Sequence, residues 1–179
     1  MRRPMTSQMI AYHFVGATLR DGRQVPPDGE WLEHSGTLVM CESGLHASPT
    51  PFEALQYAPG NVLCEVEMEG CLPISEEHKD KLVASRRRII RRMDLEVVMF
   101  PFARQCALDV AHLWKAPQIV LDFLNTGDES LRDAAWAAAR AAGNARDAAG
   151  NAADAAWDAA GAAQSKRFNG MAMAALEGK

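Results

Sequence analysis

The sequence has no apolar run that approaches the roughly 20 residues a membrane-spanning helix needs. Its N-terminus, MRRPMTSQ, is positively charged but has no apolar segment behind it, which excludes a secretory signal. Aromatic residues make up only 7% of the chain, and the four cysteines form no CxxC pair. Cys41, Cys64, Cys71 and Cys106 lie in apolar or strand-like surroundings, as buried thiols of a reducing compartment do. We therefore expect a soluble, cytoplasmic protein with no membrane partner.

The charge balance argues against a dedicated nucleic-acid binder. The chain carries 19 Lys and Arg against 23 Asp and Glu, a formal net charge of −4 at pH 7. Its 179 residues can form one domain, or a domain of roughly 100 residues with a helical appendage. Apolar residues make up 48%, but much of this is alanine in the last third, so the core is smaller than that fraction suggests.

Strand patterns dominate the first half of the chain. Residues 9–16 and the segment around 37–41 are rich in apolar and β-branched residues and predict two strands. A proline-marked start predicts a brief helix over 51–57. Residues 61–69 alternate apolar and acidic side chains, which predicts a half-buried strand with an acidic solvent face. Residues 81–92 predict a further strand with basic flanks.

Helical spacing replaces this pattern after about residue 99. Apolar residues at helical intervals predict a helix over 103–115, and Pro117 starts a second one that ends at Thr126-Gly127. Asp128 then caps an alanine-rich region. The sequence thus predicts an α+β fold with a small β-rich N-terminal domain and an all-helical C-terminal region. The expected parts are a loose extension (1–8), an α+β domain (9–99), two short helices (100–127) and an alanine-heptad region (128–179).

The alanine-rich region repeats a seven-residue unit between Asp133 and Phe168, and each unit opens with an alanine pair. One heptad position is shared by Trp136, Gly143, Gly150 and Trp157. Alanine is the best helix former, and a seam of small residues lets two helices approach closely. The glycines are poor helix interiors, so both one long helix and a folded-back hairpin remain open. The seam could face this chain's own helices, a second copy or a foreign partner.

Residues 41–70, CESGLHASPTPFEALQYAPGNVLCEVEMEG, hold the most specific local motif. In order and spacing it resembles the ADP-ribosyltransferase core of poly(ADP-ribose) polymerases, as does the strand around His13. The resemblance implies NAD as cofactor, with His13 at its ribose and Tyr57 stacked on the nicotinamide ring. His46 stands where that family has its first tyrosine. The place of the catalytic glutamate is taken by Lys81, with Glu76, Glu77 and Asp80 nearby.

Most of the chain also resembles a group of uncharacterised proteins encoded by phages and prophages. They pair a small domain containing Gly-Leu-His-Ala, here residues 44–47, with a downstream alanine-rich helix. Further matching stretches are residues 80–84, HLWKAP at 112–117 and TGDESLR at 126–132. The resemblance brings no known activity, but it implies an accessory role in phage–host conflict, such as inhibiting a bacterial defence complex.

Five arginines stand within seven residues: Arg86, Arg87, Arg88, Arg91 and Arg92. On a strand Arg86, Arg88 and Arg92 would share a face, whereas on a helix Arg88, Arg91 and Arg92 would do so. Either arrangement could hold phosphates or an acidic partner. The alternative is a solvated basic edge that balances the acidic face of a neighbouring strand. That acidic face would consist of Glu65, Glu67 and Glu69.

Two functions follow from these patterns. The first is a non-enzymatic binding protein of phage type without a cofactor, whose arginines and glutamates contact a host protein complex that can itself be associated with nucleic acid. The second is an NAD-dependent ADP-ribosyltransferase with His13, His46 and Tyr57 as catalytic residues. The cysteines and histidines lack the spacing of a metal site, so we expect none.

Overall fold

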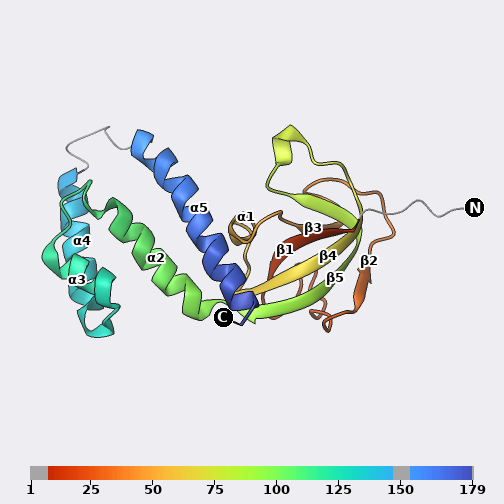
Figure 1. The fold of residues 1–179 in the computed structure, drawn as a ribbon, viewed down its shortest axis with the longest axis horizontal. Helices are drawn as coiled ribbons and strands as arrows, with labels where there is room; N and C mark the ends of the chain where they lie inside the picture. Colours follow the sequence, from red (N-terminus) through yellow and green to blue (C-terminus); the bar gives the residue numbers. More distant parts are fainter. Residues whose placement is uncertain (1–7, 147–153, 179) are drawn as a thin grey trace, which may run out of the picture. The chain divides into compact units, whose positions relative to one another are not determined.

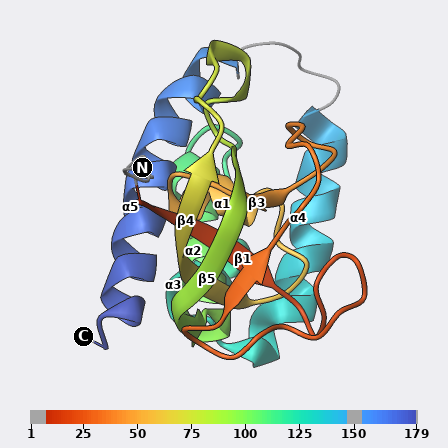
Figure 2. The same cartoon turned by 90° about the vertical axis from the view of Figure 1, so that its right-hand side faces the viewer.

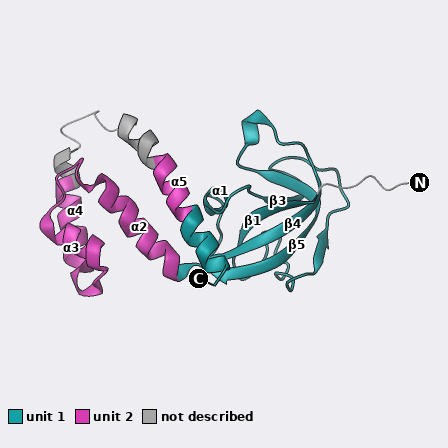
Figure 3. Cartoon of the chain, in the orientation of Figure 1, with its two compact units in different colours: residues 1–96, 169–179 teal, residues 97–168 magenta. Residues whose placement is uncertain are grey.

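The computed structural model describes residues 8–146 and 154–178, and it divides the chain into two compact units (Figure 3). Unit 1 comprises residues 1–96 and 169–179, and unit 2 comprises residues 97–168. The predicted α+β class is confirmed, since a five-stranded antiparallel sheet occupies the N-terminal half and helices the C-terminal part (Figure 1). Residues 1–7 of the expected N-terminal extension lie outside the described residues. The last residues of the chain are grouped with the sheet, unlike in the sequence-based division.

The sheet of unit 1 has the strand order β1-β4-β5-β2 (Figures 1 and 2). Strand β1 (Met9–Val15) pairs with β4 (Val62–Cys71), which pairs with β5 (Leu82–Asp94). The other side of β5 holds two short strands, β2 (Trp31–Glu33) and β3 (Leu45–Ala47). A one-turn 3-10 helix, η1 (Glu76–His78), lies in the connection from β4 to β5.

The sheet curls so strongly that β3 reaches back to β1. Ser48, directly after β3, exchanges two main-chain hydrogen bonds of 2.8 Å with Tyr12 of β1. Gly70 of β4 lies against Ser85 of β5. Gly70 has φ +67°, and a Cβ there would stand 2.2 Å from the Ser85 Oγ, so this position favours glycine. The curl creates an enclosed interior face and an outer face.

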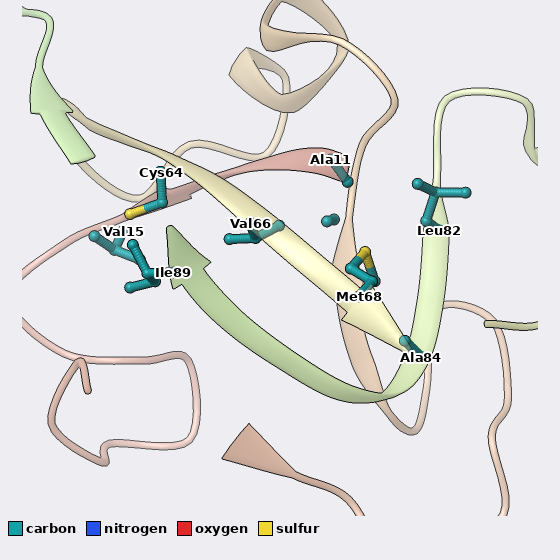
Figure 4. Close-up of a cluster of buried hydrophobic side chains, with 9 residues drawn as sticks. Ala11, Val15, Cys64, Val66, Met68, Leu82, Ala84 and Ile89 are labelled. Carbon is teal, nitrogen blue, oxygen red and sulfur yellow. The ribbon is translucent and has the colours of Figure 1, made fainter. Parts of the chain in front are cut away.

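Successive side chains of a strand point to opposite faces of the sheet, and the apolar ones line the interior face. Figure 4 shows Ala11 of β1, Val66 and Met68 of β4 and Ile89 of β5 in this cluster. Leu19 and other partly buried residues of the segment between β1 and β2 pack against it. The predicted alternation of the strand over 61–69 is therefore confirmed for its apolar side.

The strand expected around residues 37–41 is wrong. The second strand is β2 at Trp31–Glu33, and residues 37–41 form a turn instead. Val39 and Ser43 donate main-chain hydrogen bonds to each other, so these groups bond within the turn and not to a neighbouring strand. Cys41 at the tip has φ +66°. Apolar residues alone could not distinguish this turn from a strand.

The helix α1 (Pro51–Leu55) begins where the sequence predicts. Thr50 caps it, because the Thr50 Oγ1 accepts from the Glu53 N–H at 3.3 Å while the Glu53 carboxylate accepts from the Thr50 N–H at 3.0 Å. Such a reciprocal box satisfies donors that the first turn leaves free.

Unit 2 is helical, and its first helix begins earlier than expected. Helix α2 (Glu96–Ala111) contains Pro101, and the Asp94 side chain accepts from the Glu96 N–H at 2.9 Å at its start. Helix α3 (Gln118–Thr126) ends at Gly127 in the left-handed conformation, as predicted. Asp128 then caps η2 (Glu129–Leu131), which leads into α4 (Arg132–Arg146).

Helix α4 lies against α3, so in this part the alanine seam packs within the chain. Only one alanine of the first pair faces inward, since Ala135 is 3% exposed whereas Ala134 is exposed. Trp136 is 66% exposed and does not belong to the seam. Gly143 lies within α4 and does not mark a turn. Gly150 lies outside the described residues, and with it the choice between one long helix and a hairpin.

Helix α5 (Asp154–Leu176) contributes to both units. Within unit 2, the Phe168 ring meets the Phe102 ring edge-on at 4.8 Å between centroids. Within unit 1, the Asn169 Oδ1 accepts from the Phe52 N–H at 2.8 Å, and Ala172 is fully buried. No helix among the described residues has both the length and the apolar character to cross a membrane.

Candidate functional site

Three glutamate–arginine pairs cross the outer face of the sheet, and we call them the ladder: Glu65–Arg91, Glu67–Arg88 and Glu69–Arg86. The Arg88 Nε donates to the Glu67 carboxylate at 2.7 Å, and the Arg86 Nη1 donates to the Glu69 carboxylate at 2.5 Å. The three glutamate side chains are only 10–15% exposed and the arginines 36–39%. The expected acidic solvent face is therefore wrong, because the arginines cover the carboxylates.

A β-bulge decides which arginines share this face. Val66 of β4 pairs with Ile89 of β5, but the neighbouring Glu65 pairs with Arg91. Ile90 is therefore an extra residue on β5 without a partner on β4. The extra residue shifts the alternation by one, so Arg91 joins Arg86 and Arg88, and Arg92 turns to the other face. The predicted grouping of Arg86, Arg88 and Arg92 is wrong for this reason.

Trp31 of β2 packs over two ladder arginines. The guanidinium carbons of Arg86 and Arg88 lie 4.4 and 4.7 Å from the Trp31 ring centroid. Guanidinium planes over an indole are held by cation–π attraction. Glu33, two residues along β2, accepts from the Arg86 Nε at 3.1 Å. The cluster of Trp31, Arg86 and Arg88 is thus anchored from several sides.

The other end of the ladder is covered by the last turns of α5. The Arg91 Nη1 donates to the Leu176 carbonyl at 3.0 Å, and the Tyr12 hydroxyl donates to the Met173 Sδ at 3.3 Å. Burial, together with the Glu65 charge, raises the pKa of Tyr12. Arg91 therefore serves to hold the C-terminal helix, while Arg86 and Arg88 at the other end pack against Trp31.

The remaining two arginines of the run leave the outer face. Arg92 pairs with Asp28 and donates from its Nη2 to the Pro26 carbonyl at 2.7 Å, which ties down the segment between β1 and β2. Arg87 points into the interior, opposite Met68, and is 5% exposed. Its Nη1 donates to the main-chain oxygen of His46.

The structure brings the two predicted catalytic histidines together around Arg87. His13 lies on the interior side of β1, and burial, then the charges of Arg87 and His46, lower the pKa of His13 to about 3. Burial also lowers the pKa of His46, whose Nε2 accepts from the Cys41 N–H at 3.1 Å. Both imidazoles are therefore neutral at pH 7 and can donate or accept hydrogen bonds without carrying charge.

Tyr57 lies in a separate group with Asp80 and Lys81. The Tyr57 hydroxyl donates to the Asp80 carboxylate at 2.5 Å, which raises the pKa of Tyr57 and lowers that of Asp80. The Lys81 ammonium stands 5.0 Å from the Tyr57 ring centroid and 3.7 Å from the Cys41 Sγ. Cys41 contacts both this group, through the Lys81 ammonium, and His46, through its own main-chain N–H. For NAD, Tyr57 could supply a ring and Asp80 a carboxylate, but that carboxylate is already engaged by the phenol.

One protein family matches this part of the chain. The family described as a domain of unknown function, DUF7666, matches residues 9–100, slightly more than half of the 179 residues. The chain belongs to the DUF7666 family. Comparisons with curated proteins and with solved structures give no match. The DUF7666 segment spans β1 to β5, so it contains the ladder, Arg87 and the Tyr57 group.

Two residues of the DUF7666 segment matter in the structure but were missed from the sequence. Trp31 lies outside the strand expected around residues 37–41, and only the pairing of β2 with β5 places it over arginines. Asp28 stands in a turn-rich loop, 64 residues from Arg92, and no local pattern links the two. Among the described residues, no group of three or more His, Cys, Asp or Glu is placed to hold a metal ion.

Proposed function

We propose that this protein acts by binding another protein rather than by catalysis. The contact surface would be the Trp31 end of the ladder, made by Trp31, Arg86 and Arg88. The supporting observation is the anchored cluster itself, in which both guanidinium carbons lie within 4.7 Å of the indole centroid. Tryptophan and arginine are the side chains most enriched at binding hot spots. Because they are already held in place, less side-chain entropy is lost on binding.

A protein partner fits this surface better than nucleic acid does. Each ladder arginine already pairs with a glutamate, so the face carries little net positive charge. Binding to a phosphate backbone relies on unpaired cations that displace counterions. Arg86 and Arg88 still present over a third of their side-chain surface. Their remaining N–H groups suit the carbonyls and single carboxylates of a protein surface.

The identity of the partner rests on the sequence resemblance to phage-encoded proteins. We propose a host complex of the bacterial defence machinery in the bacterial cytoplasm, which this protein would inhibit by occupying its surface. The exposed Trp136 of α4 offers a second contact, to a further copy of this chain. This oligomer would use a surface in unit 2 and not the Trp31 cluster of unit 1.

A pull-down from bacterial lysate with matched tryptophan variants tests the proposal. The wild-type chain should recover a defined complex, Trp31→Ala should lose it, and Trp136→Ala should retain it. Arg88→Ala should weaken recovery in the same way, because it removes one guanidinium of the cluster. A complex that survives both unit 1 changes, or no complex at all, contradicts the proposal. Loss with Trp136→Ala alone would assign the contact to the alanine-rich helix.

ADP-ribosyl transfer is the second candidate, and the position of the Asp80 carboxylate beside the Tyr57 ring favours it. The carboxylate stands beside the ring that the resemblance assigns to nicotinamide, and His13 and His46 lie near each other. Incubation with labelled NAD and lysate should then release nicotinamide and label a macromolecule, and Asp80→Asn should abolish both signals. Neither signal, together with no thermal shift by NAD, rejects the enzyme.

A further inference from the structure

Arg87 differs from the other four arginines of its strand. Arg86, Arg88, Arg91 and Arg92 each pair with a carboxylate. Arg87 is the most buried of the five, at 5% exposed, and its guanidinium donates a hydrogen bond to the neutral His46 carbonyl. Within the described part of the chain, no carboxylate forms an ion pair with its guanidinium.

The surroundings of Arg87 add no negative charge. His13 and His46 are neutral imidazoles, and burial raises the pKa of the nearby Cys64 thiol to about 11, so it stays protonated at pH 7. The next charge that acts on Arg87 is positive, from Arg23. Burial lowers the pKa of Arg87 itself only to about 10, so the guanidinium remains charged.

A buried charge without a counter-charge is costly, and native proteins normally pair it. A guanidinium has five N–H donors in a planar fork that matches the oxygens of a phosphate or carboxylate. Neutral imidazoles close to it can donate further N–H bonds to the same oxygens. An oxyanion would therefore supply the missing counter-charge.

We propose that the interior face at Arg87 is a binding site for the phosphate group of a small molecule, held by the Arg87 guanidinium with the His13 imidazole as a neutral donor. A phosphate has more acceptor oxygens than a single carboxylate, so it suits the Arg87 fork and the His13 donor together. Arg23 is exposed on the segment between β1 and β2, where it pairs with Asp21 at 2.7 Å. That segment covers the interior through Leu19 and Val25, so the ligand would enter beside it. This site does not depend on the Trp31 cluster, which lies on the opposite face.

Calorimetric titration and thermal unfolding of the full chain test the site with two probes, inorganic phosphate and a phosphate monoester. Chloride at equal ionic strength serves as the reference. The wild-type midpoint should rise with probe concentration, as linkage requires for a ligand that binds only the folded protein. Tighter binding of the monoester points to a phosphorylated small molecule, and equal binding points to free phosphate.

Arg87→Met should weaken phosphate binding by roughly tenfold or more, because it removes a charge-assisted hydrogen-bond donor. Arg92→Met is the matched control on the same strand and should bind phosphate like the wild type, since Arg92 already has Asp28. Arg87→Lys keeps the charge without the fork and should bind with intermediate affinity; it also serves if the methionine variant fails to fold. Equal binding by wild type, Arg87→Met and Arg87→Lys, or no binding of either probe, overturns the proposal. Arg87 would then serve only as a donor to the His46 carbonyl.

Discussion

His13 provides a pH-dependent stability that can be worked out from its burial. The folded protein holds the pKa of His13 at about 3, through burial first and then the charges of Arg87 and His46. In the unfolded chain the same imidazole titrates near about 6.5. Between these values the unfolded chain binds a proton that the folded protein does not. Because the pKa of His13 is lowered in the folded protein, its contribution to stability is fully present above the unfolded pKa. That contribution is lost as the pH falls below the unfolded pKa.

The size of the effect follows from proton linkage. One proton taken up only by the unfolded chain changes the free energy of unfolding by about 1.4 kcal/mol per pH unit. Acidification from neutral pH to about pH 5 crosses roughly 1.5 units below the unfolded pKa, so His13 should remove about 2 kcal/mol of stability. For a domain with a stability of about 5–15 kcal/mol this is a large fraction.

Urea unfolding at pH 7 and pH 5, followed by hydrogen exchange of the β4 amides, measures this loss in unit 1. His13→Gln serves as the reference, since glutamine is uncharged at both pH values. His46 remains in both proteins, and neither Arg87 nor Cys64 titrates in this range, so the difference between the two proteins isolates His13. An equal loss of stability by wild type and His13→Gln on acidification would refute this role of His13.

Four further substitutions test the α1 cap and the packing within each unit. Phe14→Ala should destabilise unit 1 by about 3–5 kcal/mol in urea unfolding, because this side chain is 1% exposed and leaves a cavity; a loss under 1 kcal/mol contradicts its burial. Thr50→Ala should cost about 1 kcal/mol through loss of the α1 cap, measured as a lower thermal midpoint, whereas an unchanged midpoint excludes a contribution of the cap. Ala135→Leu should destabilise unit 2 by about 1–3 kcal/mol through overpacking, while Ala134→Leu on the exposed side changes stability by about 0.5 kcal/mol or less; the reverse order would show that the other alanine faces inward.

The order of the elements could be predicted because each depends on local patterns. The apolar–acidic alternation of β4 and the proline that opens α1 are visible within a few residues. The bounds of an element were harder to predict where its local sequence pattern was ambiguous. Residues 37–41 contain strand-forming side chains, but their main-chain groups bond within a turn. Pro101 obscured the start of α2, which lies five residues before it.

The candidate sites depended on contacts that no short stretch of sequence contains. The arginine run was evident as a concentration of charge, and its pairing with the glutamates of a neighbouring strand was one of the open alternatives. The assignment of each arginine to a face required the bulge at Ile90, which arises from the pairing of β4 with β5. Trp31 reaches Arg86 and Arg88 only because β2 pairs with β5 across more than 50 residues.

By itself, the sequence determined an α+β chain with an apolar side to β4, a dense arginine run and an alanine-rich helical region. These features follow from periodicity and composition, which act over one or two turns of chain. The tertiary structure alone decided that Arg87 points inward without a carboxylate while its neighbours are paired on the outer face. It also decided that Ala135, and not Ala134, is buried. The physical reason is shared: a side chain's surroundings depend on the register between distant segments, and one extra residue in a strand is enough to reverse them.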